Sequence, residues 1–434
     1  MLSALSTRPA GQSPRTMNLT LGLSLGLGLF LAGLLTTEGQ RKPIFSSPIL
    51  MTKVYPRGWK EEMNAQNVAK RNMEFGLKML RKLAANSPRK NVFFSPLSIS
   101  SAFSLLCLGA QDSTLAEIKE GFNFKGMPDR DLHQAFHRFL YQLNQEKEDI
   151  KLLFGNTMFM DRKLEPQQKF LRVARNIYNA DILPVNFHDL EDTQKQINEY
   201  ISQKTHGRID NLVKNIDPGT VMLLTNYVYF RARWEHEFDP KQTKEEDFFV
   251  SRTQAVKVPM MFRAGLYDMG YDKQLFCTIL EIPYQGNFTA TFLLPDKGKM
   301  RHLQENLRAD AFGRWKQLIT KRVVNVHVPR LLISSTYNLK KTLSELGISR
   351  IFEQHGDLTR ISPHRSLKVG EAVHKAELKM DEKGTEGAAG SGVETLPMEK
   401  PENFTINRPY LMVLYETRMP SPLFLAKISN PKGK

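Results

Sequence analysis

One apolar run constrains the fold of this chain more than any other stretch. Residues Val221 to Phe230 read VMLLTNYVYF, a nearly continuous series of β-branched, aromatic and other apolar side chains. A strand with one face in water alternates apolar and polar residues, whereas a strand covered on both faces is apolar throughout. The run therefore predicts a central strand in a sheet that is packed on both sides.

Helical patterns precede this strand, and strand patterns follow it. Apolar residues recur at three- and four-residue spacings before it, as they do on the buried face of a helix. We expect helices within residues 59–83, 91–110, 113–121, 129–146, 167–180 and 189–205. After residue 234 strand signals dominate, between 248 and 329 and again at 364–379 and 410–428. Because no regular alternation of strand and helix persists, we expect an α+β fold in one large domain.

The N-terminus carries the pattern of a secretory signal peptide. Leu19 to Leu35 form an apolar run that follows two arginines and gives way to small and polar residues ending at Gly39. Charged, apolar and small residues in this order are typical of a cleaved signal. A membrane-spanning signal anchor is the alternative, but the run is slightly short and lacks a strongly basic flank. We expect residues 1–39 to be removed, 40–58 to form a flexible arm and 59–434 to fold.

The chain is strongly basic, with a formal net charge of +16 at pH 7. Such a surface attracts polyanions without selecting among sulfated glycans, nucleic acid and anionic membrane. Secretion argues against nuclear DNA and favours heparin-like glycans outside the cell. A glycan is therefore the expected polyanionic partner.

Cysteines and sequons fit a secreted protein without a disulfide framework. Cys107 and Cys277 are the only cysteines, so neither a disulfide scaffold nor a C-x-x-C zinc site is predicted. Two unpaired buried thiols are expected, and one bridge between them is the alternative. Asn287 and Asn403 each begin an Asn-Phe-Thr sequon and are candidate glycosylation sites.

No familiar catalytic or cofactor template occurs in the sequence. The G-x-S-x-G elbow, the H-E-x-x-H zinc motif and the G-x-x-x-x-G-K-[ST] phosphate loop are all absent. His302, His327 and His374 have no ligand spacing and are interpreted as structural or surface groups. We therefore predict no enzyme, no metal site and no cofactor.

A segment of small residues near the C-terminus carries the most informative pattern. Lys379 to Pro401 reads KMDEKGTEGAAGSGVETLPMEKP. Alternate side chains of a strand point to opposite faces, and every second residue from Thr385 to Thr395 is small or uncharged while both glutamates fall in the other set. We interpret the segment as an exposed bait loop that can also enter a sheet as a strand.

The chain resembles the serpin family over nearly all of its expected mature length, from about Trp59 to Asn430. The motifs are NVFFSPLSIS, ISQKTHGRI, LLTNYVYFRARWEHEFDP, VGEAVHKAELKMDEKGTEGAA and the C-terminal FTINRPYLMVLYETRMPSPLFLAKISNP. The chain is most similar to the antitrypsin-like clade A, with Tyr410 at a position where the family usually has phenylalanine. The resemblance implies a serpin fold of about nine helices and three β-sheets, with an exposed reactive-centre loop at about 382–403.

The resemblance also implies a mechanism and its residues. A serine protease attacks the bait bond, and the loop inserts into the main sheet before water releases the acyl-enzyme. The family's hinge corresponds here to Glu382, Gly384, Thr385, Gly387, Ala388, Ala389 and Gly390. Glycine replaces much of the family's usual alanine run, from which we expect slower insertion and a larger share of loop cleaved as a substrate.

The position of the bait bond follows from the family's usual spacing. Seventeen residues counted from Glu382 end at Met398, so the implied scissile bond is Met398–Glu399. Lys400 is the rival, but Pro401 after it blocks cleavage there. Methionine suits a chymotrypsin-like specificity pocket, and similarity within clade A implies a kallikrein-type protease.

Two further sites are implied by the family layout. Trp234 matches the tryptophan at which the loop first enters the sheet, with an ordinary core aromatic as the other interpretation. Candidate heparin-binding residues are Arg208, Arg231, Arg233 and Lys379, with scattered surface charge as an equally weighted alternative. A second basic patch comprises Arg360, Arg365 and Lys368.

Two functions remain open at this stage. The first is a secreted, monomeric inhibitor of serine proteases. The second is a non-inhibitory serpin that acts as a carrier or a signalling ligand. An extracellular hydrolase is a third class, but the sequence offers no nucleophile for it.

Overall fold

A computed structural model describes residues 61–145, 150–363, 367–384 and 400–433. Its α-helices, nine in these residues, are α2 (Glu61–Asn86), α3 (Pro96–Cys107), α4 (Asp112–Gly121), α5 (Asp129–Leu143), α6 (Gln168–Tyr178), α7 (Leu190–Lys204), α8 (Met300–Asn306), α9 (Asp310–Leu318) and α10 (Leu339–Ser344). The described residues belong to one compact unit, Arg57–Lys434. The expected signal peptide and arm, residues 1–58, lie outside the described part.

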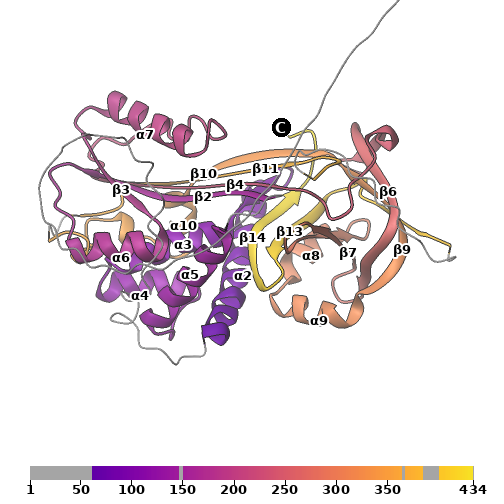
Figure 1. Cartoon of the computed structure of the whole chain (residues 1–434), viewed down its shortest axis with the longest axis horizontal. Helices are drawn as coiled ribbons and strands as arrows, with labels where there is room; N and C mark the ends of the chain where they lie inside the picture. Colours follow the sequence, from indigo (N-terminus) through magenta and orange to yellow (C-terminus); the bar gives the residue numbers. More distant parts are fainter. Residues whose placement is uncertain (1–60, 146–149, 364–366, 385–399, 434) are drawn as a thin grey trace, which may run out of the picture. The chain divides into compact units, whose positions relative to one another are not determined.

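Five strands form the main sheet, in the order β10-β11-β4-β2-β3. They are β2 (Ile150–Asp161), β3 (Asp181–Val185), β4 (Met222–Ala232), β10 (Leu331–Asn338) and β11 (Glu371–Met380). The apolar run occupies the central strand β4, in which every residue except Arg231 is buried. Helix α7 covers one face of the sheet, and α3 and α5 lie on the other (Figure 1). The predicted central, doubly covered strand is confirmed.

The remaining strands follow the path β1-β14-β13-β8-β7-β6-β9-β12, with β5 paired to β6. They are β1 (Val92–Phe94), β5 (Lys244–Phe249), β6 (Ala255–Asp272), β7 (Cys277–Tyr284), β8 (Phe288–Pro295), β9 (Thr320–Pro329), β12 (Glu402–Thr405), β13 (Tyr410–Glu416) and β14 (Met419–Ile428). The long strand β6 pairs with β5, β9 and β7 in turn. Because β6 makes all three pairings, these strands form a single hydrogen-bonded sheet. The serpin resemblance, with three β-sheets in all, implies two separate sheets in this part of the fold.

The helix that follows the Ser-Pro step begins where the sequence predicts. Ser95 is the N-cap of α3, its side chain accepts a hydrogen bond from the Ser98 N–H, and Pro96 occupies the first turn. Proline is tolerated there because a first-turn N–H has no partner within the helix. All residues of α3 are buried, which fixes this helix beneath the main sheet.

Sequence patterns missed the edge strands of the main sheet. Strand β3 is short and contains Pro184, which removes a backbone donor and is tolerated at an edge. Strand β10 alternates buried and exposed positions, with Leu332 62% exposed. Neither strand has the continuous apolar run that identifies a central strand.

Cys107 and Cys277 are both free and buried, as predicted. Burial raises the pKa of each thiol to about 12, so neither is a ready nucleophile. Within the described ranges, no helix is both long and apolar enough to span a membrane.

Candidate functional site

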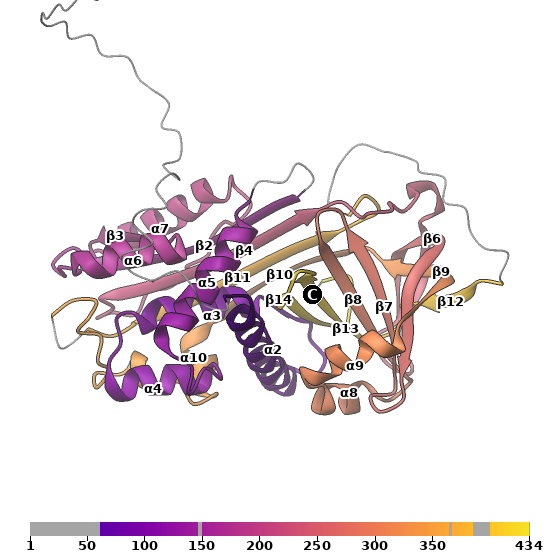
Figure 2. The same cartoon turned by 60° about the horizontal axis from the view of Figure 1, so that its bottom comes forward.

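The candidate site is built around two neighbouring parallel strands. Residues Glu371–Leu378 of β11 pair with Leu223–Phe230 of β4, and no strand lies between them. Both views of the fold show β11 beside β4, with β10 beyond it (Figures 1 and 2). Antiparallel β2 and β10 flank the pair on its two sides. The parallel pair β4–β11 therefore lies between two antiparallel pairings within the main sheet.

The chain leaves β11 in a tight turn that rests on the end of β4. Asp381 and Gly384 exchange two backbone hydrogen bonds, each 3.0 Å long. Gly384 has a φ of +102°, and a Cβ there would lie 2.4 Å from both the Ala232 oxygen and the Trp234 nitrogen. Only glycine fits this close approach. The first part of the predicted hinge is thus docked against the central strand.

Trp234 is the centre of this docking site. Its indole nitrogen donates to the Asp381 oxygen at 2.9 Å, and its backbone N–H donates to the Lys383 oxygen at 3.1 Å. Its ring stacks on Tyr284 with a centroid separation of 3.9 Å. Trp234 is fully buried, so it is both a core aromatic and a contact of the hinge. The core interpretation of Trp234 is thus confirmed, while its role as the point where the loop enters the sheet stays a prediction.

Glu382 ties the same turn to the neighbouring sheet. Its carboxylate accepts hydrogen bonds from the Thr243 hydroxyl and the Arg330 Nε, each at 2.6 Å. Burial opposes its ionisation, but the bonds from Arg330 and Thr243 outweigh burial and hold the pKa of Glu382 below its ordinary value. Arg330 follows β9 directly, so this ion pair links the hinge to the second sheet.

A buried polar network lies beneath the strand pair. Asn226 of β4 and His374 of β11 are register partners, and His374 Nδ1 lies 2.5 Å from the amide oxygen of Asn226. The Ser95 N–H donates to His374 Nε2 at 3.1 Å, so Nδ1 carries the proton and donates to Asn226. The Ser98 hydroxyl donates to the same amide oxygen at 2.8 Å. The network binds both strands to α3.

Sequence patterns carried no signal for this network beyond the interpretation of His374 as a structural or surface group. Burial lowers the pKa of His374 to about 3, which keeps the imidazole neutral. A neutral ring donates through one nitrogen and accepts through the other, as this geometry requires. The predicted structural role of His374 fits its position between two strands and a helix.

The candidate heparin-binding residues gather at the hinge end of the strand pair. Phe230 pairs with Leu378, so the following residues Arg231 and Lys379 share one face of the sheet. Arg208 lies 5.8 Å from the ring centroid of Tyr229, which precedes Arg231 on that face.

Arg233, the fourth candidate, directly follows the end of β4. Acidic neighbours reduce the net positive charge of this group. Lys379 pairs with Asp381 at 3.2 Å, and Arg208 acts electrostatically on Glu377. The four side chains are thus brought to one region of the fold.

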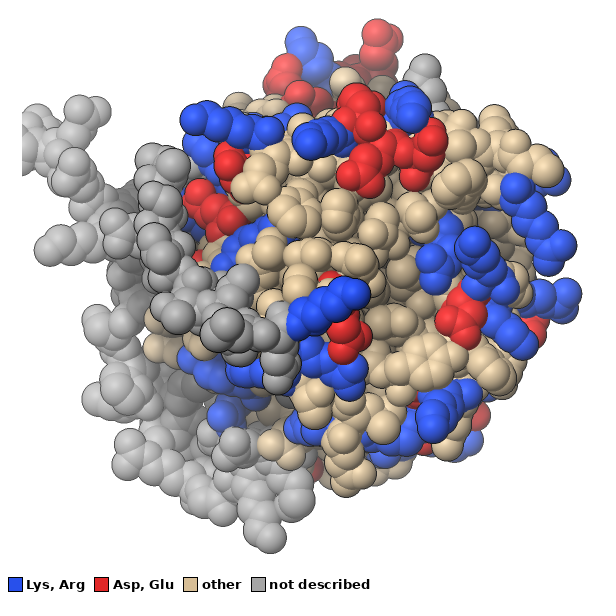
Figure 3. All heavy atoms as spheres, turned by 90° about the vertical axis from the view of Figure 1, so that its right-hand side faces the viewer, with Lys and Arg blue, Asp and Glu red and all other residues tan. Residues whose placement is uncertain are grey.

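Basic residues also occupy other parts of the surface. On the face that Figure 3 shows, lysines and arginines are spread widely, while the acidic side chains concentrate near its upper edge. In the second predicted patch, Arg360 lies beside the end of α3, since its N–H donates to the Gly109 oxygen. Arg365 of that patch lies outside the described residues.

Both sequon asparagines are exposed. Asn287 occupies the turn between β7 and β8 with a φ of +71°, and its main-chain oxygen accepts from the Thr417 N–H. Asn403 lies in β12 and its side-chain oxygen accepts from Asn325 at 3.0 Å. Because both side chains are exposed, both asparagines remain candidate glycosylation sites.

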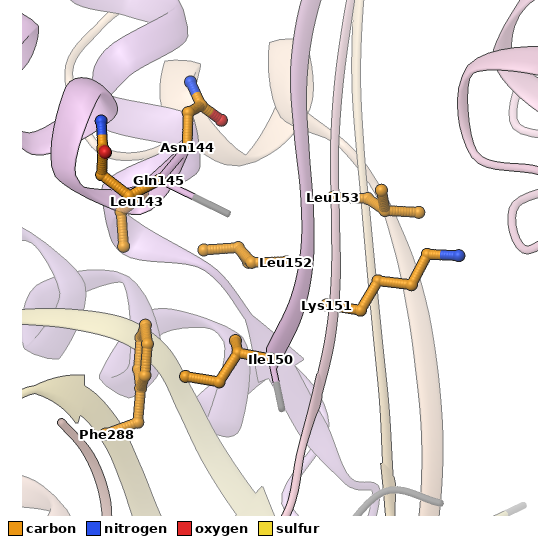
Figure 4. A pocket seen from close by; sticks show the side chains of 8 residues that line it. All are labelled: Leu143, Asn144, Gln145, Ile150, Lys151, Leu152, Leu153 and Phe288. Carbon is orange, nitrogen blue, oxygen red and sulfur yellow. The ribbon is translucent and has the colours of Figure 1, made fainter. Parts of the chain in front are cut away.

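A separate cavity of about 260 Å³ lies between the end of α5 and the start of β2. Leu143, Ile150, Leu152 and Phe288 point toward one another, while Lys151 and Leu153 point to the other side of the strand (Figure 4). The lining offers apolar surface and two amides but no acid–base pair. Elsewhere in the described chain, no group of three histidines, cysteines or acids is placed to hold a metal.

Much of the predicted loop lies outside the described residues. This applies to the hinge residues Thr385, Gly387, Ala388, Ala389 and Gly390, to the reactive bond Met398–Glu399 and to the alternating face from Thr385 to Thr395. The structure describes the loop's two ends, which leave β11 and enter β12.

Comparison with known proteins identifies the family. The family model described as Serpin (serine protease inhibitor) matches residues 70–431. The chain belongs to the serpin family. Serpin A12 of Rattus norvegicus is 63% identical over 411 residues, which cover 95% of this serpin and 100% of that protein. The alpha-1-antiproteinase of Rattus norvegicus is 41% identical over 360 residues, which cover 82% and 88%.

Solved structures agree with this assignment. Human thyroxine-binding globulin has a TM-score of 0.81 and 32% identity, over 85% of this serpin and 99% of that chain. The α+β serpin fold expected from sequence is confirmed, as is the resemblance to clade A. Within that clade the sequence phrases CLGAQDSTL and KVPMMFR resemble vaspin, which is Serpin A12.

Proposed function

We propose that this serpin is a secreted inhibitor of serine proteases that acts by loop insertion. A target protease attacks Met398–Glu399 and forms an acyl-enzyme. Residues 385–396 then enter the main sheet between β4 and β11 before water releases the enzyme. The alpha-1-antiproteinase relative supports the inhibitory class.

The parallel pairing of β4 and β11 carries this proposal. A segment that follows β11 through a tight turn folds back antiparallel to β11. Because β4 runs parallel to β11, the same segment is also antiparallel to β4. One inserted strand therefore replaces a single parallel pairing by two antiparallel pairings, which are slightly more stable per residue.

The closed sheet must persist until the protease arrives. The docked turn at Gly384, the Trp234 bonds and the Arg330–Glu382 ion pair hold the hinge in place. Such a state is maintained by the height of a barrier and not by being the most stable form. We therefore place the activation barrier in the release of these contacts.

Met398 sets the proposed target class. A methionine side chain fits an apolar specificity pocket, as in chymotrypsin-like enzymes, and similarity to vaspin directs the proposal to a kallikrein-type protease. Glu399 and Lys400 on the leaving side narrow the choice further. The serpin is the consumed partner of the protease and is assigned no enzymatic activity of its own.

Heparin-like glycans are the proposed modulators. Arg208, Arg231, Arg233 and Lys379 lie near the hinge, and the chain is strongly basic overall. Sulfate groups pair with arginine through two hydrogen bonds, and such contacts weaken with salt. Secretion, removal of residues 1–39, the arm at 40–58, glycosylation at Asn287 and Asn403, and a monomeric state belong to the same proposal.

The decisive experiment is a search for a covalent complex. The protein is incubated with chymotrypsin-like and kallikrein-type proteases, with and without heparin, and separated in SDS. We expect a stable band for the wild type and none for Met398→Pro, while Met398→Arg shifts complex formation to trypsin-like proteases. Cleavage after Met398 without a stable complex overturns the inhibitor proposal.

A carrier function is the second candidate. It is favoured by the structural similarity to human thyroxine-binding globulin, whose name states that it binds thyroxine. A carrier that does not need insertion shows no gain in thermal stability when its loop is cut. A large gain after cleavage therefore favours the inhibitor over the carrier.

A further inference from the structure

The cavity at the end of α5 lies directly beside a sequon. Phe288 lines the cavity, and the preceding residue Asn287 is exposed in the turn between β7 and β8. Consecutive Cα atoms are about 3.8 Å apart, so a group attached to Asn287 starts next to the cavity wall. The turn itself is held in place, because the Asn287 main-chain oxygen accepts a hydrogen bond from the Thr417 N–H at 2.9 Å.

The cavity offers both apolar and hydrogen-bonding surface. Its apolar wall consists of side chains that point toward one another, namely Leu143, Ile150, Leu152 and Phe288 (Figure 4). The exposed amides of Asn144 and Gln145 border it. Gln145 donates to the Tyr141 oxygen at 3.3 Å, whereas the Asn144 side chain has no hydrogen-bond partner within the described chain. Among the described lining residues only Lys151 is charged, and it points to the other side of β2.

These surfaces match the chemistry of N-acetylglucosamine, the first sugar of an N-linked glycan. Its ring carbons and acetamido methyl group are apolar, and its hydroxyl and amide groups form hydrogen bonds. A cavity of about 150 Å³ accommodates benzene. The present cavity of about 260 Å³ therefore has room for one sugar ring with its acetamido group.

We propose that the first sugar of a glycan on Asn287 packs into this cavity, with its apolar surface against Leu152 and Phe288 and a hydrogen bond to the Asn144 amide. The inference rests on the glycosylation of Asn287, which belongs to the proposed function. Because the sugar is tethered to the residue next to the cavity, its effective concentration there reaches about the millimolar range. A weak contact is therefore sufficient to fill the cavity.

A sugar in this position braces the main sheet near the hinge. Ile150 is the register partner of Ala232, the last residue of β4. Gly384 of the hinge turn approaches Ala232 closely. The other walls of the cavity come from α5 and from β8 of the second sheet. The sugar therefore contacts three elements at once and restrains the start of β2.

The test follows backbone hydrogen exchange in protein produced by cells that make only high-mannose glycans. Mass spectrometry first establishes whether Asn287 carries a glycan. One sample keeps the glycan, a second is trimmed by endoglycosidase H to the first sugar, and a third is stripped by a peptide-N-glycosidase, which leaves aspartate. Asn287→Gln provides an uncharged form without glycan. Asn403→Gln is the matched control, because it loses a sequon on β12 at the edge of the second sheet.

We expect the amides of residues 143–145 and 150–153 to exchange about two- to tenfold more slowly with the intact or the trimmed glycan than without it, which is the effect of about one hydrogen bond. Asn403→Gln should match the glycosylated wild type. Asn144→Ala should reduce the difference between trimmed and stripped protein, whereas Asn176→Ala, which removes an exposed amide on α6, should leave it unchanged. Equal exchange with and without the glycan, or an Asn287 that carries none, overturns the inference.

The proposed inhibition is tested separately. Uptake of a synthetic peptide that copies residues 385–396 between β4 and β11 reports on loop insertion. Its absence refutes loop insertion, while the exchange comparison still decides whether the glycan occupies the cavity.

Discussion

The indole nitrogen of Trp234 donates a hydrogen bond to the main-chain oxygen of Asp381 across 2.9 Å. These residues lie 147 positions apart, one beyond the end of β4 and the other beyond the end of β11. The bond closes the parallel strand pair at the point where the hinge begins. If the loop inserts as proposed, stability of the closed sheet and readiness for insertion depend on the same contacts.

Replacing Trp234 by phenylalanine removes this donor and leaves a buried carbonyl oxygen without its partner. We expect a loss of about 1–3 kcal/mol in stability, measured by urea unfolding, together with faster peptide uptake between β4 and β11. Trp315→Phe is the matched control, since its indole donates to Asp272 away from the hinge. Equal acceleration of peptide uptake in both variants would count against a special role for Trp234.

Gly384 should not tolerate even one added methyl group. Gly384→Ala combines an unfavourable φ of +102° with contacts of 2.4 Å to the backbone of β4 and Trp234. Gly347→Ala is the control, because its φ is +90° but a Cβ there has no neighbour within 4 Å. We expect Gly347→Ala to cost about 1 kcal/mol through backbone strain alone. The Gly384 variant should lose clearly more thermal stability, and equal losses would mean that the turn does not rest on β4.

The Arg330–Glu382 pair should matter more than a comparable surface pair. Arg330→Gln leaves the buried Glu382 carboxylate without its cation, and we expect a loss of about 3 kcal/mol. In the control Arg322→Gln, the lost partner Glu402 is half exposed, and the expected loss is below about 1 kcal/mol.

The pair also predicts a response to acid. Since the pKa of Glu382 is held below its ordinary value of 4.5, its stabilising contribution is present above that pH and is lost as pH falls below it. Urea unfolding at several pH values tests this. Arg330→Gln should lose less stability than the wild type on acidification, and identical acid profiles would contradict the assignment.

His374→Ala should destabilise the main sheet by removing the link between β4, β11 and the start of α3. The variant leaves the Ser95 N–H and one acceptor site of Asn226 unsatisfied, and we expect a loss of about 2–4 kcal/mol at pH 7. The partly exposed His302→Ala serves as the control, and an equal loss in both variants would contradict the network.

The same histidine predicts a loss of stability in acid. Because burial lowers the pKa of His374 to about 3, the free energy of unfolding of the wild type should fall as pH drops from about 6.5 toward 3.

Local sequence was sufficient for the features that depend on neighbouring residues. The run Val221 to Phe230 identified a doubly covered strand, since only burial on both faces permits so few polar side chains. Ser95 and Pro96 marked the start of α3 because capping acts within one turn. Long motifs around the hinge were enough to name the family.

Other features were beyond sequence patterns because they depend on partners. Strand β10 was missed since edge strands have no continuous apolar signature. Strand β6 is one long strand, and its pairing with three neighbours, which no local pattern reveals, sustains it. His374 carried no periodic or motif signal for the network that it completes.

The sequence by itself determined the central strand and the family, and it predicts which residues form the hinge. Only the tertiary structure decided that β11 pairs with β4, that Arg330 reaches Glu382 and that His374 meets Asn226. The physical reason is that apolar patterning specifies burial, whereas it does not specify which distant segment supplies the covering surface or the opposing charge. Those choices are made when the whole core packs.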